Sequence, residues 1–359
     1  MMSKNPQAAA EFPRVSFILL SYNQEQFIDE AVAGALAQDY PNLKIVFSDD
    51  NSTDSTLMKL RQHAEKYEGM HEILVNCATG GRGILAHLYA ATALSSGDLI
   101  VVAAGDDVSY PTRVSRLVER WQATGADALS SGFDRVDVFG KLLECVLVNP
   151  ASEYDPAVYF DHACPQISGL SAAYDRRVFD AVPLPVEPIM AEDYFFSLVM
   201  GLRSRRVEQI SEPLVAYRSH QGAISHAHWA GVEHHERVSA SQAGMFSASL
   251  RVFRQIAVGA ESIDPSWGSP AKVDHGRLAN DIDFLGYRAN WLSSTFARRA
   301  LALSQFREPD QRRWMIPRLL GVSFLSLSRR VRMRLTGRSM SGFARHVLPR
   351  AWTARLAKN

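Results

Sequence analysis

Short apolar runs alternate with helical segments through the first 107 residues, and this alternation constrains the fold most strongly. The run VSFILLSYN (15–23) precedes residues 26–40, whose apolar side chains recur at helical spacing. LKIVFSDDNSTDST (43–56), HEILVN (71–76) and DLIVVAAGDD (98–107) repeat the plan of an apolar run followed by a turn or helix. Fully apolar strands that alternate with helices predict an α/β chain with a mainly parallel sheet and helices on both faces.

Polar residues follow each of the predicted strands. They are Ser21-Tyr22-Asn23, Asp49-Asp50, the turn TGGRG (79–83) and Asp106-Asp107. Ligands of such sheets bind beyond the carboxyl ends of the strands, so we expect one site at this edge. The glycine-rich turn lacks the G-x-G-x-x-G spacing, which argues against a Rossmann dinucleotide site.

Composition places the 359-residue chain among ordinary globular proteins, with 47% hydrophobic and 21% charged residues. No run approaches the roughly 18 apolar residues of a membrane span, and the N-terminus has no signal-like apolar core. The three cysteines form no C-x-x-C pair, which favours a reducing compartment over a disulfide framework or structural zinc site. We therefore expect a cytoplasmic protein.

Charge is distributed unevenly along the chain. Residues 311–359 contain eleven Arg, one Lys and no Asp or Glu, a local charge of +12, whereas the other 310 residues sum to −11. Leu320, Phe324, Leu327, Val331 and Leu335 recur at helical spacing in this basic tail, and Arg334 and Arg338 interrupt the apolar side. The pattern favours a helix at an anionic membrane surface. A solvated or oligomer-forming tail is the alternative, and no motif supports nucleic-acid binding.

Four motifs in order carry a family resemblance. They are VSFILLSYN, LKIVFSDDNSTDST, GDLIVVAAGDDVSYPTR and AEDYFFSLVMGL. Together they resemble the family 2 inverting glycosyltransferases of the GT-A fold, in which the first half binds a nucleotide-sugar and the second half binds the acceptor. The resemblance implies a catalytic domain over 13–235, divided at 125/126, after a flexible segment 1–12. A helical C-terminal region, 236–359, would follow and would include the basic tail.

The adjacent aspartates after the fourth strand resemble the family's metal-binding carboxylates. The resemblance implies that Asp107 binds Mg²⁺ or Mn²⁺ and that Asp106 binds the ribose or assists the metal. Many relatives carry an aspartate where this chain has Ala104, which puts the number of ligands in doubt. His220, within LVAYRSHQGAIS (214–225), is a third candidate metal ligand in a segment expected to cover the donor, and Arg218 a candidate phosphate partner. A plain Gly-Asp-Asp turn is the structural alternative.

Three further residues match the nucleotide-binding side. The resemblance places Tyr22 against a uracil or thymine ring, Asp50 at the base N–H, and Arg82 near the diphosphate. For Tyr22 the alternative is a half-buried aromatic, and for Arg82 a solvated surface side chain.

Glu192-Asp193 resembles the family's second acidic motif. By resemblance Asp193 is the general base, and Glu192 holds the acceptor or the sugar hydroxyls. The alternative is acidic residues in the first turn of a helix, where negative charge is favoured in any case.

The resemblance implies a metal-dependent inverting transferase that moves a sugar from a UDP- or dTDP-sugar to an acceptor hydroxyl of a lipid-linked or cell-surface glycan. We expect it to lie peripherally on the inner face of the membrane, with a homo-oligomer as an option. A sugar-1-phosphate nucleotidyltransferase is the alternative enzyme, but LLSYNQEQF lacks that class's glycine-rich loop. A catalytically inactive scaffold of the same fold is disfavoured by intact Asp50, Asp107 and Asp193.

Overall fold

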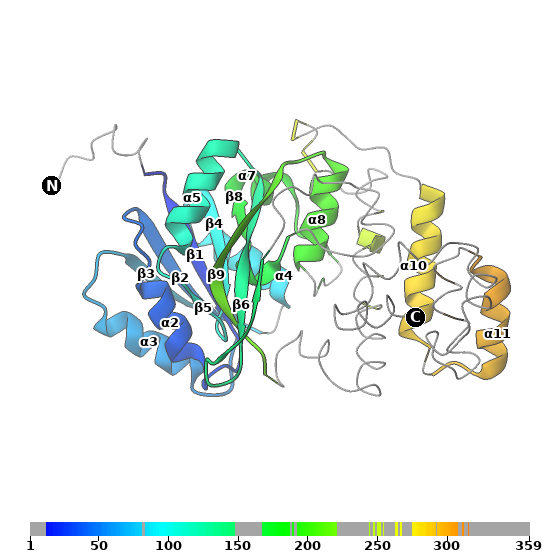
Figure 1. Cartoon of the computed structure of the whole chain (residues 1–359), viewed down its shortest axis with the longest axis horizontal. Helices are drawn as coiled ribbons and strands as arrows, with labels where there is room; N and C mark the ends of the chain where they lie inside the picture. Colours follow the sequence, from blue (N-terminus) through cyan, green and yellow to red (C-terminus); the bar gives the residue numbers. More distant parts are fainter. Residues whose placement is uncertain are drawn as a thin grey trace, which may run out of the picture. The chain divides into compact units, whose positions relative to one another are not determined.

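A computed structural model of the chain contains a single nine-stranded mixed sheet (Figure 1). The structure describes residues 12–80, 83–147, 167–186, 189, 192–220, 244, 247, 250–252, 254, 263, 264, 266, 267, 275–291, 293–307, 311 and 315. The strand order is β3-β2-β1-β4-β8-β6-β9-β5, and β7 pairs with β6 outside this path.

The four strands predicted from the first half form the parallel part of the sheet. They are β1 (Val15–Ser21), β2 (Leu43–Asp49), β3 (Glu72–Cys77) and β4 (Leu99–Ala104). β1 lies between β2 and β4, and β3 lies outside β2, all in parallel pairing. Their carboxyl ends therefore meet at one edge, as the sequence predicts.

Helices cover both faces of this sheet. One face carries α2 (Ile28–Leu36), α3 (Thr56–Lys66) and α5 (Arg113–Thr124), which share an apolar core with Val15, Phe17 and Leu19 of β1. The other face carries α4 (Ile84–Ala93), α7 (Arg176–Ala181) and α8 (Glu192–Leu202). Tyr89 of α4 packs there against Phe179 and Phe196. The prediction of a sheet with helices on both faces is confirmed.

The second half of the sheet is mixed. It contains β5 (Val108–Ser109), β6 (Ala128–Val136), β7 (Leu142–Val146), β8 (Ala173–Asp175) and β9 (Val207–Arg218), with a 3-10 turn, η1 (Gly169–Ser171), before β8. β8 is antiparallel to β4 and β6, whereas β9 is parallel to β6 and antiparallel to β5. The long strand β9 thus ends beside β5, which begins directly after Asp106 and Asp107.

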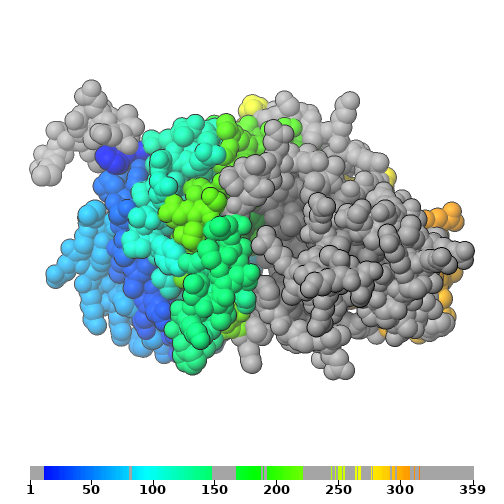
Figure 2. All heavy atoms as spheres, viewed as in Figure 1, coloured from blue at the N-terminus to red at the C-terminus, as the bar shows by residue number. Residues whose placement is uncertain are grey.

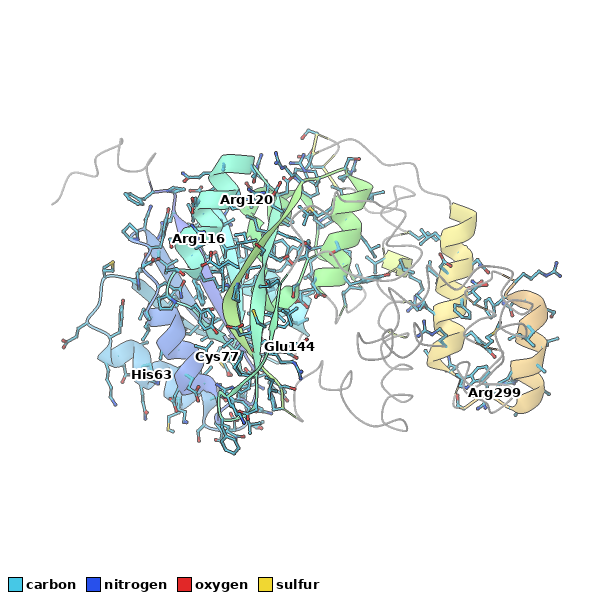
Figure 3. All side chains as sticks on the ribbon, in the orientation of Figure 1. His63, Cys77, Arg116, Arg120, Glu144 and Arg299 are labelled. Atoms are coloured by element: carbon cyan, nitrogen blue, oxygen red, sulfur yellow. The ribbon has the colours of Figure 1, made fainter. Side chains whose placement is uncertain are left out.

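Ion pairs join α5 to β9 at the surface of this unit. Arg116 and Arg120 of α5 (Figure 3) contact Glu212 and Glu208 at 2.9 and 2.6 Å. Because such exposed pairs contribute little individually, the apolar faces of the helices provide most of the packing energy.

The Cα positions divide the chain into two compact units, Met1–Ile282 and Asp283–Asn359. Figure 2 shows the described residues between 12 and 220 of the first unit, coloured blue to green, as one continuous surface. The second unit has its own small core, formed by Phe284, Trp291, Ala302, Phe306 and Met315. Phe284 belongs to α10 (His275–Ala289) and Ala302 to α11 (Phe296–Gln305), and Trp291 and Phe306 lie just beyond the ends of these helices. The boundary predicted at residue 235 remains a prediction.

None of the described helices is long and apolar enough to cross a membrane. Of the basic tail, only Gln311 and Met315 belong to the described part of the chain. The predicted amphipathic helix around Leu320–Val331 lies outside it.

Candidate active site

The carboxylates Asp106 and Asp107 lie in the turn between β4 and β5, at the edge where the parallel strands end. Asp107 is 5% exposed, and its Oδ1 accepts a hydrogen bond from the backbone N–H of Arg218 at 2.8 Å. That bond joins the end of β9 to the turn. Gly105 lies immediately before the pair, where a Cβ would come within 2.5 Å of Gln24 Oε1. The turn is therefore packed closely between β9 and the first loop.

Electrostatics at this turn favour a cation. Burial raises the pKa of Asp107 well above its ordinary value, and the neighbouring charge of Asp106 raises it further, while the Arg218 N–H lowers it. The buried guanidinium of Arg113 donates to Ser109 Oγ and to the carbonyl of Val102. Burial lowers the pKa of Arg113 to about 9, and the charge of Asp107 opposes that shift. A plain turn gains nothing from two repelling carboxylates, whereas a bound cation relieves the repulsion.

His220 is brought to the same carboxylates. Its Nε2 lies 3.0 Å from Asp106 Oδ2, and its ring packs on Phe27 with centroids 4.7 Å apart. The two carboxylates are the oxygen ligands that suit Mn²⁺ or Mg²⁺, so they fit the metal that the family resemblance implies, and His220 is an additional candidate ligand. Within the described ranges, no three His, Cys, Asp or Glu side chains already converge as a metal cluster. The metal-binding roles of Asp106, Asp107 and His220 remain predictions.

Arg218 does not take the phosphate-binding role expected from its sequence context. It is 1% exposed, and its guanidinium donates to the carbonyls of Asp106 and Val138 and to Glu30 Oε2. It also lies over the ring of Phe27, 5.0 Å from the centroid. All three guanidinium nitrogens thus have protein partners. Leu214–Arg218 belongs to β9, so the predicted covering segment starts after this strand, and residues 221–225 lie outside the described residues.

Asp50 presents an unsatisfied acceptor at the end of β2. Its side chain is 8% exposed, and Oδ1 is buried without a hydrogen-bond partner among the described residues. Asp49, in contrast, accepts from Ser21 Oγ, Ser52 Oγ and the Ser52 N–H. A buried acceptor that lacks a donor is costly unless a ligand supplies one. This difference supports the prediction that Asp50 receives a base N–H.

Tyr22 is 55% exposed and follows Ser21, whose carbonyl accepts a hydrogen bond from the Asp50 N–H. The base-stacking role of Tyr22 remains a prediction, and its exposed ring is available for that contact. An exposed aromatic ring beside a free acceptor suits a planar base. Arg82 lies outside the described residues.

Two loops around Tyr22 are tied together by side-chain hydrogen bonds. Asn23 accepts from the N–H of Thr53, and Ser52 Oγ accepts from the N–H of Asn23. Asp54 accepts from the N–H groups of Glu25 and Thr56. These bonds hold the loops after β1 and β2 in one arrangement before any ligand binds.

The second carboxylate pair, Glu192-Asp193, opens α8. Asp193 Oδ2 accepts from the Gly169 N–H at 3.1 Å, and Oδ1 accepts from the Tyr194 N–H at 2.7 Å. Burial raises the pKa of Glu192 to about 8, with a further contribution from the charge of Asp193. Burial also raises the pKa of Asp193, but its backbone donors oppose the shift. In this pair the backbone donors favour the charged form of Asp193, whereas burial keeps Glu192 protonated at neutral pH.

Topology brings the two carboxylate pairs to one edge of the sheet. β8 runs antiparallel to β4, with Ala173 opposite Val101, and the Val102 N–H donates to the carbonyl of Ala172. The turn η1 precedes β8 and contacts β4, so Gly169 lies toward the end of β4 from which Asp106 and Asp107 emerge. Acidic residues that only stabilise the first turn of α8 would need neither the burial of Glu192 nor the hydrogen bond between Gly169 and Asp193.

Three functional candidates escaped the sequence reasoning. Phe27 and Glu30 look like ordinary residues of an amphipathic helix, and Gly169 looks like a turn glycine. Each becomes part of the site through contacts with residues at least 24 positions away in the sequence, as Gly169 does with Asp193. No local pattern could have found them.

Comparisons with known proteins agree with this geometry. Residues 16–182 match the model of the family described as Glycosyl transferase family 2. A glycosyltransferase of Nostoc sp. is 26% identical over 245 residues, 65% of this chain and 72% of the relative. The putative glycosyltransferase EpsE of Bacillus subtilis is 33% identical over 30% of this chain. The succinoglycan biosynthesis protein ExoO of Rhizobium meliloti is 30% identical over 39% of it. The matches span 37% and 38% of the lengths of EpsE and ExoO.

Solved structures show the same fold. TarS of S. aureus in complex with UDP-GlcNAc superposes with a TM-score of 0.52 at 17% identity, covering 87% of this chain and 84% of that chain. The mannosyltransferase PcManGT from Pyrobaculum calidifontis, in complex with GDP-Man and Mn²⁺, gives 0.52 at 20%, covering 90% and 84%. The fold is therefore of the GT-A type that the sequence resemblance implies. Residues 16–182 thus match glycosyl transferase family 2, and the sequence motifs occur in the order that the family resemblance implies.

Proposed function

We propose that the protein is a metal-dependent inverting glycosyltransferase that moves a sugar from a UDP- or dTDP-sugar to an acceptor hydroxyl. The observation that carries the proposal is the placement of two carboxylate pairs, Asp106-Asp107 and Glu192-Asp193, at the carboxyl edge of the parallel strands, with Asp107 and Glu192 buried. An inverting transfer needs a divalent cation, held by carboxylates, near the departing diphosphate. It also needs a carboxylate near the attacking hydroxyl to accept its proton.

The donor side uses the edge formed by β1, β2 and β4. The base lies against Tyr22 and gives its N–H to the free Oδ1 of Asp50. Asp106, Asp107 and His220 would hold Mg²⁺ or Mn²⁺, which would neutralise charge on the diphosphate. The tied loops at Asn23 and Ser52 keep the base-binding edge in position. Arg82 is the remaining candidate for the diphosphate.

The chemical step requires proton removal from the acceptor hydroxyl. Asp193 takes this proton as the acceptor oxygen attacks the anomeric carbon and the bond to the diphosphate oxygen breaks. Its two backbone donors, Gly169 and Tyr194, orient the carboxylate for that role. Glu192, which carries a proton at neutral pH, donates a hydrogen bond to the acceptor or to a sugar hydroxyl.

The acceptor that we propose is a lipid-linked or cell-surface glycan. One relative is named as a succinoglycan biosynthesis protein, which supports polysaccharide synthesis. The +12 charge of residues 311–359 supports peripheral binding to the inner face of a membrane. The tail would then bring the catalytic unit to a lipid-linked acceptor, and a homo-oligomer through the tail is the alternative.

The proposal is tested by incubating the full chain with Mn²⁺ and a panel of nucleotide-sugars. Thermal stabilisation identifies the donor, and NMR of the transferred sugar gives its anomeric configuration. We expect stabilisation by a uracil or thymine nucleotide-sugar and a product of inverted configuration. A product with retained configuration contradicts the mechanism. Formation of a nucleotide-sugar from a sugar-1-phosphate would instead show a nucleotidyltransferase.

A further inference from the structure

The start of α2 holds the residues after β9 against the carboxylate turn. Glu30 Oε2 lies 2.7 Å from a guanidinium nitrogen of Arg218, and this pair spans 188 residues of sequence. The two side chains differ sharply in exposure, 60% for Glu30 and 1% for Arg218. Phe27, one helical turn earlier, contacts both the Arg218 guanidinium and the His220 ring.

Arg218 transmits this contact to the carboxylates. Its N–H binds Asp107 Oδ1, and its Nε binds the carbonyl of Asp106 at 3.1 Å. A planar guanidinium held at all its nitrogens fixes the backbone of its own residue, because its fork geometry allows few orientations. Fixing Arg218 in turn fixes His220, two residues later, beside Asp106.

We infer that Glu30 is a positioning residue that sets divalent-cation binding through Arg218, with Phe27 as the surface on which both Arg218 and His220 rest. We call Phe27, Glu30 and Arg218 the α2 latch. The inference rests on the proposed function, because that function assigns a role to the cation. It adds Glu30, an exposed helix residue that contacts neither the sugar donor nor the acceptor in that proposal.

The chain supplies a matched control on the neighbouring position. Asp29 is also an exposed acid at the start of α2, and it pairs with Lys59 and His63 of α3 at 2.6 and 2.8 Å. Asp29→Asn therefore removes an acid and an ion pair from the same turn without touching Arg218. Glu30→Ala breaks the latch, and Glu30→Gln keeps a hydrogen-bond acceptor for the guanidinium while removing the charge.

The first measurement is Mn²⁺ affinity by titration calorimetry in the presence of UDP, with the melting temperature recorded alongside. We expect Glu30→Ala to weaken Mn²⁺ binding about fivefold or more, within the usual range of coupling between sites. Glu30→Gln should recover part of the loss, and Asp29→Asn should match the unmutated protein. Equal Mn²⁺ affinity in all four proteins overturns the inference.

The second measurement does not depend on any ligand. Hydrogen exchange of the peptide that contains Arg218–His220 reports the N–H bond to Asp107. Glu30→Ala should speed this exchange, whereas Asp29→Asn should leave it unchanged. If the unmutated protein binds no Mn²⁺, the metal role in the proposed function fails, while the exchange experiment still decides the latch. Unchanged exchange in Glu30→Ala overturns it.

Discussion

The Gly169 N–H donates a hydrogen bond to Asp193 Oδ2 at 3.1 Å, joining the turn before β8 to the first turn of α8. The same glycine has no room for a side chain, because a Cβ would lie 2.6 Å from Glu192 Oε1 and 3.2 Å from Asp193 Oδ2. Gly169 is thus a direct support of the carboxylate that we propose as the base.

Replacing this glycine should lower turnover more than it lowers donor affinity. Gly169→Ala pushes Glu192 and Asp193 from their positions, so turnover should fall about 10- to 100-fold. UDP affinity, measured by calorimetry, should change little. Ser168→Ala, one residue earlier, leaves the Gly169 N–H in place and serves as the control. Full turnover in Gly169→Ala would show that Asp193 needs no such support.

The roles of the two acids separate in single substitutions. Asp193→Asn keeps the shape but removes the proton acceptor, so turnover should fall by roughly 10² or more with donor affinity nearly unchanged. Glu192→Gln should cost less, because Glu192 already carries a proton at neutral pH. Steady-state kinetics on both variants measures the difference. Retained turnover in Asp193→Asn, with loss in Glu192→Gln, would move the base to Glu192.

Glu192 should also impose a pH dependence on stability. Its pKa is about 8 in the folded protein, against 4.5 for the ordinary carboxyl. Between these values the folded protein retains a proton that the unfolded chain has released. The contribution of Glu192 to the free energy of unfolding therefore falls as pH rises from about 4.5 through about 8.

Urea denaturation at pH 5.5 and pH 8 tests this effect. Glu192→Gln cannot ionise, so relative to the unmutated protein it should gain stability at pH 8. Two proteins whose stabilities change in parallel with pH would contradict the shifted pKa of Glu192.

The basic tail should bind anionic membranes. Each basic residue near such a surface contributes on the order of 1 kcal/mol, and salt screens the attraction. The full chain should therefore co-sediment with anionic but not neutral vesicles and be released at high salt.

A truncation can separate membrane binding from folding if it respects the C-terminal core. Met315 is buried in that core, so the cut belongs after Ile316 rather than earlier. The shortened chain loses nine Arg and one Lys and should no longer sediment with anionic vesicles. Activity on a soluble acceptor should survive, while activity on a lipid-linked acceptor should drop. Equal sedimentation of both forms would favour oligomerisation through the tail.

The sequence predicts the parallel half of the fold well, because its signals are local. Apolar runs specify β1, β2, β3 and β4, and the polar residues after them specify the site edge. The mixed half is less predictable, since the pairing of β9 with β5 and β6 depends on contacts between distant residues. The same limit explains Arg218, which looks like a phosphate ligand in sequence. In the fold its three guanidinium nitrogens bind Glu30 and two carbonyls.

The central claim is that Asp107 binds a divalent cation on which nucleotide binding depends. The most direct test is calorimetric titration of UDP into the unmutated protein and Asp107→Ala, each with and without Mn²⁺, with circular dichroism to confirm folding. The unmutated protein should bind UDP more tightly with Mn²⁺, and Asp107→Ala should lose that gain while remaining folded. Equal UDP affinity of the unmutated protein with and without Mn²⁺ would contradict the claim.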